Sequence, residues 1–127
     1  MYFVVETVDV TTIADGSATA YTTNAVHGPI HSIQYIKDGT TPFDNGVDFT
    51  ITTEETLQNL WVDTNVNASE TVCPRQPTHD STGAASLYAA ADEPVETSIM
   101  AVNERIKIVI AQGGNVKLGQ FKIIVGG

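Results

Sequence analysis

The chain has 127 residues, 42% of them hydrophobic and 17% charged, and a formal net charge of −9. This composition is typical of one globular domain that buries its own core, and it excludes a disordered chain. A negative field of this size repels phosphate, so we expect neither nucleic acid nor an anionic membrane surface as a partner.

The sequence also bears on targeting and on cysteine chemistry. Residues 1–10 lack a basic region and Glu6 interrupts their apolar run, so we expect no signal peptide. No apolar run approaches the roughly 20 residues needed to span a bilayer. The single cysteine, Cys73, excludes an intrachain disulfide and disfavours a cysteine-built zinc site, and we expect it to pack as a small apolar residue.

The residue mix favours strands over helices. Thr, Val and Ile together number 42, whereas Leu numbers 4. Side chains branched at Cβ lose rotamer freedom in helices and pack well on a pleated sheet. Alternation and turn signals predict eight strands, in chain order 2–10, 17–23, 30–37, 47–53, 59–66, 98–102, 105–112 and 118–125.

The alternation also predicts which side chains face the core. Asp38-Gly39 and Asn45-Gly46 mark turns, so 30–37 and 47–53 are predicted to form a hairpin with an ornamented loop. The turn after Gln112 likewise predicts a C-terminal hairpin of the last two strands. The inward positions are Ile33, Tyr35, Val47, Phe49, Ile51, Ile106, Ile108, Ile110, Phe121, Ile123 and Val125.

Two further features belong to this pattern. The dipeptide Gly28-Pro29, after His27, is expected to break the chain before the third strand. Trp61 is expected in the core, because a lone tryptophan in a small β domain more often packs than binds.

Residues 73–96 interrupt the pattern. Pro74, Pro77 and Pro94 disfavour a central strand, whereas the alanine-rich middle, AASLYAAA, has high helix propensity. Structureless connections of this length are uncommon in compact domains. Three alternatives stay open: a projecting arm, a binding loop, or a short helix that caps one end of the fold.

These observations predict one all-β domain over residues 1–127, an antiparallel β-sandwich or jelly-roll-like fold with a long arm at about 73–96. No alternation of strands and helices appears, so a parallel α/β sheet is not expected.

No constellation of residues indicates catalysis. The nucleotide, phosphate, zinc-protease and serine-hydrolase motifs are missing from the sequence. His27 and His31 flank Gly28-Pro29 and have no evident third ligand; His79-Asp80-Ser81 are adjacent in sequence, whereas catalytic triads are assembled from distant segments. Asp44 to Asp48 fits a turn better than a calcium loop. We therefore expect no enzyme, no metal and no cofactor.

The arm supplies the candidate interface residues, Arg75, Leu87 and Tyr88. Arg75 is either solvated or a partner for a carboxylate across an interface, and the sequence leaves both open. Leu87 and Tyr88 form an apolar group without evident partners in their own segment, and exposed apolar groups often mark contact sites.

Four segments carry a family resemblance: GPIHSIQYIKDGTTPFDNGVDFTITTEET, LWVDTNVNAS, CPRQPTHDSTGAA and NERIKIVIAQGGNVKLGQFKIIV. In the order and residue content of these segments the chain resembles small all-β virion structural proteins of tailed bacteriophages. These are capsid decoration (cement) proteins or head–tail junction proteins. The resemblance covers about residues 26–125.

The resemblance implies a non-enzymatic virion protein, made in the host cytoplasm. Its most specific form is a decoration protein that binds and stabilises the head lattice, as a homo-oligomer whose partner is the major capsid protein. Two alternatives stay open: a head–tail connector or neck ring protein bound to the head–tail junction proteins, and a small β-sandwich module that binds carbohydrate at a host surface. Such a module needs exposed aromatic side chains, for which Tyr35, Trp61 and Tyr88 are the candidates.

Overall fold

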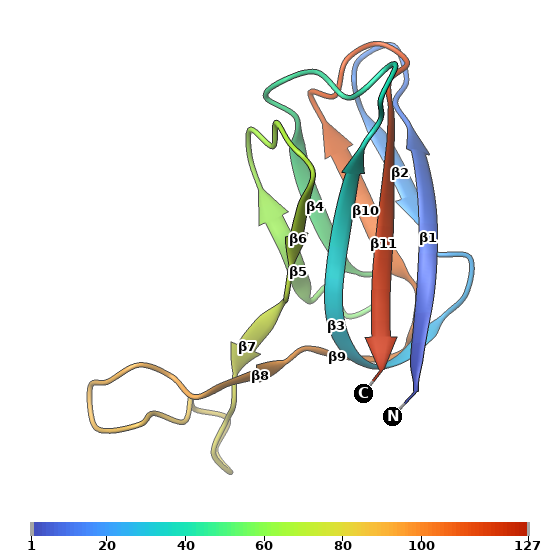
Figure 1. Ribbon diagram of the computed structural model, residues 1–127. Coiled ribbons are helices and arrows are strands. Elements are labelled where there is room, and N and C mark those ends of the chain that lie inside the picture. The colour runs from blue at the N-terminus through green and yellow to red at the C-terminus, as the bar shows by residue number, and fades with distance from the viewer. Residues whose placement is uncertain (1, 127) are drawn as a thin grey trace.

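The computed structural model describes residues 2–126, which form two packed antiparallel sheets and a projecting arm (Figure 1). Within this part of the chain there is no helix, and hence none that could cross a membrane. The predicted all-β, antiparallel sandwich is confirmed. The strands are β1 (Phe3–Thr11), β2 (Ala18–Tyr21), β3 (Val26–Lys37), β4 (Asp48–Thr53), β5 (Asn59–Asp63), β6 (Glu70–Val72), β7 (Arg75–Pro77), β8 (Glu96–Ser98), β9 (Met100–Glu104), β10 (Ile106–Ala111) and β11 (Leu118–Gly126).

The larger sheet has the order β1-β11-β3-β6, and β9 pairs with the first part of β3. The smaller sheet has the order β2-β10-β4-β5. Each sheet turns one face inward, so buried and partly exposed residues alternate along strands such as β10 and β11. A third, two-stranded sheet, β7-β8, forms the root of the arm.

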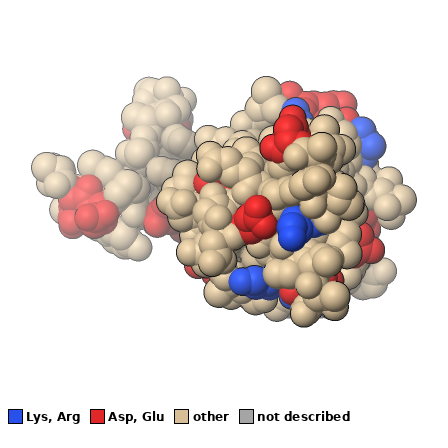
Figure 2. Space-filling view, turned by 90° about the horizontal axis from the view of Figure 1, so that it is seen from above, with Lys and Arg blue, Asp and Glu red and all other residues tan. Residues whose placement is uncertain are grey.

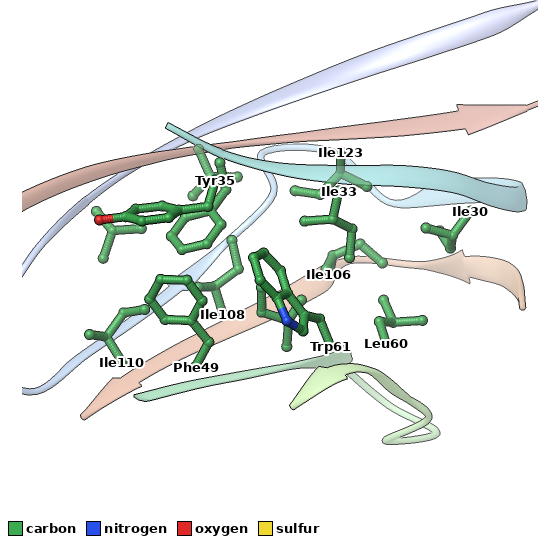
Figure 3. Packing of buried hydrophobic residues seen from close by; sticks show 14 of the residues in the cluster. Ile30, Ile33, Tyr35, Phe49, Leu60, Trp61, Ile106, Ile108, Ile110 and Ile123 are labelled. Atoms are coloured by element: carbon green, nitrogen blue, oxygen red, sulfur yellow. The ribbon is translucent and has the colours of Figure 1, made fainter. Parts of the chain in front are cut away.

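The core lies between the two sheets, where side chains from β3, β4, β5, β10 and β11 interdigitate (Figure 3). Its centre is aromatic: Phe49 makes edge contacts with Tyr35, Trp61 and Phe121 at ring-centroid distances of 4.8, 5.3 and 5.1 Å. All eleven side chains predicted to face inward are buried, and Trp61 is in the core as expected. Burying each large apolar side chain contributes about 1.5–3 kcal/mol, so these strands are held mainly by this layer.

Neither predicted hairpin is present. Strands β3 and β4 lie in different sheets, and so do β10 and β11. The loop between β3 and β4 crosses the end of the sandwich. Its Phe43 side chain is buried and stacks on the ring of Tyr35, with the two ring centroids 5.9 Å apart. Burial of this loop side chain favours a crossing between sheets over a tight hairpin.

The expected break at Gly28-Pro29 is also wrong, because both residues lie within β3. Gly28 has a φ of +132°, and the pairing with β9 shifts register between Val26 and His27. The irregularity is absorbed by a strand that changes neighbours along its length: β9 beside its first half, β11 and β6 beside its second.

Candidate protein-docking arm

The arm, residues 73–98, leaves the lower end of the sandwich between β6 and β9 (Figure 1). Its two roots are held in the body: Pro74 is buried, and Ile99 is 4% exposed with its carbonyl accepting a hydrogen bond from the Ile30 amide at 2.8 Å. Strands β7 and β8 then pair antiparallel, Arg75 with Ser98 and Pro77 with Glu96. Because both roots are fixed, the direction in which the arm leaves the body is set by the fold.

Beyond β7 and β8 the arm forks into two turns. Its stem is closed by backbone hydrogen bonds from the Thr78 amide to the Val95 carbonyl at 2.7 Å and from the Ser86 amide to the Thr78 carbonyl at 2.8 Å. The first turn is capped by the carboxylate of Asp80, which accepts hydrogen bonds from the Thr82 amide and hydroxyl at 2.8 and 2.7 Å. These bonds, with the Thr82 hydroxyl foremost, hold the pKa of Asp80 below its ordinary value.

The short helix considered for AASLYAAA is absent, and this segment forms part of the fork instead. The Ser86 amide bonds across to Thr78, and the Tyr88 amide bonds to the Glu93 carbonyl at 3.2 Å, so neither takes part in a helical turn. A helix of two turns is marginal in water unless a face of it packs on the protein. The arm offers no such surface, since residues 87–93 are all exposed.

The predicted interface residues lie at two places on the arm. Leu87 and Tyr88 are together in the fork, with side chains 43% and 72% exposed. Arg75 lies at the root, where its Nη1 donates to the Pro74 carbonyl and the Ser98 hydroxyl, both at 3.2 Å. Among residues 2–126 no carboxylate lies within ion-pairing distance of Arg75. The pairing of Arg75 with an acid across an interface stays a prediction.

Charge adds to this picture. The arm carries Arg75 against four carboxylates, Asp80, Asp92, Glu93 and Glu96, and so a net charge of −3. Figure 2 shows the arm standing clear of the body, with acidic side chains on its surface. The arm therefore combines an exposed apolar pair, Leu87 and Tyr88, with a net negative charge.

The histidines and carboxylates considered from the sequence have the following places in the fold. His27 and His31 lie on one strand, β3, and no three His, Cys, Asp or Glu side chains within residues 2–126 are grouped as metal ligands would be. Asp80 is bound within its own turn. The carboxylate of Asp48 accepts hydrogen bonds from the Asn65 amide and the Gln112 side chain, both at 3.2 Å, and so is used in joining loops.

Two expectations about single residues have different outcomes. Cys73 is exposed, so the expectation that it packs as an apolar residue is wrong; it lies at the arm's root, where Pro74 takes the buried position. Tyr35 and Trp61 are buried and Tyr88 is exposed, so these three do not share a surface.

A group of exposed apolar residues was missed by the sequence reasoning. Phe3, Val5, Met100 and Val102 are 43%, 54%, 46% and 61% exposed. Alternation around the buried Ala101 could have placed Met100 and Val102 on the opposite face of the strand. Whether that face meets water or another element could not be inferred without knowing which neighbours the strand has.

Comparisons with known proteins leave the family open. No family model matches the chain, and no curated protein matches it. The chain is similar to a solved structure described as "Crystal Structure of FLHE", with 13% sequence identity, full coverage of both chains and a TM-score of 0.49. This level of similarity supports no inference about function.

Proposed function

We propose that this protein is a non-enzymatic structural protein of a bacteriophage virion that docks through its arm, in its most specific form a capsid decoration protein that binds and stabilises the head lattice. The observation that carries the proposal is the arm, a rooted hairpin whose exposed fork presents Leu87 and Tyr88 away from their own domain. The partner class comes from the resemblance of the sequence to such virion proteins.

The energetics of the arm support a docking role. An exposed leucine and tyrosine in adjacent positions leave much of their apolar surface in water, and aromatic anchors such as Tyr88 are enriched among the residues that dominate binding. A protein that is placed many times on a lattice gains avidity from repetition, so a small contact per copy suffices.

The second candidate is a head–tail junction ring, which the same arm would serve, and copy number separates the two. The carbohydrate-binding module is disfavoured because two of its three aromatic candidates, Tyr35 and Trp61, are buried.

The test is quantitative mass spectrometry of purified particles, with the isolated domain re-added to particles that lack it. Hundreds of copies per particle indicate decoration, about six to twelve indicate a closed ring at the neck, and absence from particles overturns the proposal. In the re-addition assay the double variant Leu87→Ala/Tyr88→Ala should bind at least tenfold more weakly than the wild type. Ile13→Ala, at a residue 61% exposed in the β1–β2 connection, is the matched control and should bind normally.

A further inference from the structure

The lower half of the outer face of the larger sheet carries apolar side chains from four strands. Register places Val5 beside Ile124 on β1 and β11, Met100 beside Pro29 on β9 and β3, and Val102 beside His27. Phe3 and His31 join it through an edge contact between their rings at 5.4 Å. We call this surface the lower outer face; its members are Phe3, Val5, His27, Pro29, His31, Met100, Val102 and Ile124.

This face differs from the rest of the molecule in charge. None of its eight members is a carboxylate, in a chain that has 15. The same sheet does carry acids above it, at Asp9 on β1 and Glu70 on β6. The polar groups on the lower outer face are the rings of two histidines, His27 and His31, both exposed. Nδ1 of His31 lies 3.1 Å from the Ser32 hydroxyl, which leaves Nε2 to meet a partner.

The fork of the arm is the complement of this face within the same sequence. It has an apolar pair, Leu87 and Tyr88, for an apolar surface, and carboxylates at Asp92 and Glu93 for imidazole N–H groups. On a body that is acidic elsewhere, an acidic arm is repelled least where carboxylates are missing.

A chain cannot place its own fork on its own lower outer face. The arm ends at Ser98, and Ile99 alone separates it from β9, which is the margin of that face. The buried Pro74 and Ile99 fix the arm so that it runs away from the sandwich (Figure 1). The donor of the fork must therefore be a second copy.

We propose that the arm of each copy docks on the lower outer face of a neighbouring copy, in a head-to-tail arrangement. The two contacting surfaces differ, so the interface is heterologous, and its repetition around an axis gives a ring when the rotation between copies closes. This inference assigns the fork to a second copy rather than to the head lattice itself. It concerns self-association of the purified protein and goes beyond the proposed virion role, which could fail while the copies still associate.

The experiment is a mixing test by sedimentation velocity, over a range of concentrations. The wild type should form one oligomer larger than a dimer. The fork variant Leu87→Ala/Tyr88→Ala keeps an intact face, and the face variant Val102→Glu keeps an intact arm; each alone should be a monomer. Mixed in equal amounts, the two should form a one-to-one heterodimer, because the intact arm of the face variant can dock on the intact face of the fork variant. Nothing larger should form, because the arm and the face left over in that heterodimer are the substituted ones. Val62→Glu, at a residue 58% exposed on β5 of the other sheet, should assemble as the wild type does.

Charge at the face provides a second readout. His27→Glu should weaken self-association at least tenfold, because it adds a carboxylate opposite the acidic fork. His27→Lys should preserve it. Equal weakening by both substitutions would overturn the proposed contact between the fork's acids and this face.

Other outcomes also decide the matter. A wild type that stays monomeric at high concentration overturns the proposal. So does a face variant that dissociates while the fork variant assembles normally, since this indicates face-to-face packing of two sheets. A photo-crosslinker in place of Tyr88, with one copy isotopically labelled, should join the fork to peptides containing Val5, His27 or Val102 of the other copy; crosslinks confined to the smaller sheet contradict it.

Discussion

Glu104 and Thr56 tie the end of β9 to the turn between β4 and β5. The carboxylate of Glu104 accepts hydrogen bonds from the Thr56 amide at 3.1 Å and hydroxyl at 2.9 Å, and from the Glu55 amide at 2.8 Å. Since β9 belongs to the larger sheet and β4 and β5 to the smaller one, this buried carboxylate joins the two layers at the end that carries the arm.

Replacing Glu104 by Gln should destabilise the domain by about 1.5–3 kcal/mol at neutral pH, the range for hydrogen bonds to a charged group. Chemical denaturation at pH 7 measures this, and Glu55→Gln, on an exposed neighbouring side chain, is the control. No change in Glu104→Gln would show that the carboxylate adds nothing beyond an amide.

The same pair predicts a pH dependence. Burial disfavours the charged form of Glu104, but hydrogen bonds from Thr56 and Glu55 outweigh burial and lower its pKa below the usual 4.5. A carboxyl with a lowered folded-state pKa stabilises the fold fully above its unfolded pKa, and this stability is lost as pH falls through the folded value. The difference in unfolding free energy between wild type and Glu104→Gln should therefore shrink below pH 4.5. A difference that grows on acidification would contradict the assignment.

Gly119 should not tolerate a side chain. A Cβ there would overlap the ring of Phe43, with Cζ at 2.7 Å, and the ring is enclosed by the core. Gly119→Ala should cost about 1–3 kcal/mol by overpacking, which lowers the thermal midpoint by roughly 3–5 °C per kcal/mol for a domain of this size. Gly39→Ala, where nothing lies within 4 Å of the new Cβ, should be nearly neutral.

Ile108 is the most direct test of the sandwich core. It is fully buried on β10, between β2 and β4. Ile108→Asp should unfold the domain, because a buried unpaired charge costs on the order of the whole stability of about 5–15 kcal/mol. Circular dichroism should show loss of the β signal for this variant, whereas Val62→Asp, on an exposed side chain, should keep it.

Tyr88 should matter for docking and not for folding. Its side chain is 72% exposed in the fork, so Tyr88→Ala removes little buried area. At concentrations where both proteins are monomeric, the thermal midpoint should change by less than about 2 °C, while self-association and particle binding weaken at higher concentration. A large fall in the midpoint would show that the fork packs on its own domain.

How far the sequence predicts this structure depends on the kind of contact. Alternation places Ile106, Ile108 and Ile110 inward correctly, because period 2 holds whichever strand lies alongside. It cannot say that β10 pairs with β2 and β4 while β11 pairs with β1 and β3, since a turn signal such as Asn45-Gly46 fits a crossing between sheets as well as a hairpin.

For the arm and the lower outer face, too, the sequence predicts some features and misses others. The prolines of 73–96 predict a segment outside the main sheets, and the structure has it there, although Arg75–Pro77 and Glu96–Ser98 pair as a small sheet of their own. Helix propensity misled for the alanines, because cross-arm hydrogen bonds such as Ser86 to Thr78 are set by the path of the stem. The lower outer face could not be predicted at all, since it is assembled from β1, β3, β9 and β11, which are distant in sequence.

Hydrogen exchange across residues 79–93, in the isolated protein and in the assembly, tests most directly whether the arm is a docking element. Residues 79–93 are almost all exposed and their amide hydrogen bonds stay within the arm, so in the isolated protein, kept monomeric by low concentration, they should exchange rapidly while the amides of β10 are protected. Protection of residues 79–93 that appears only on assembly is the result we predict. Equal, strong protection in both states would mean that the arm packs on its own domain, and would contradict the account.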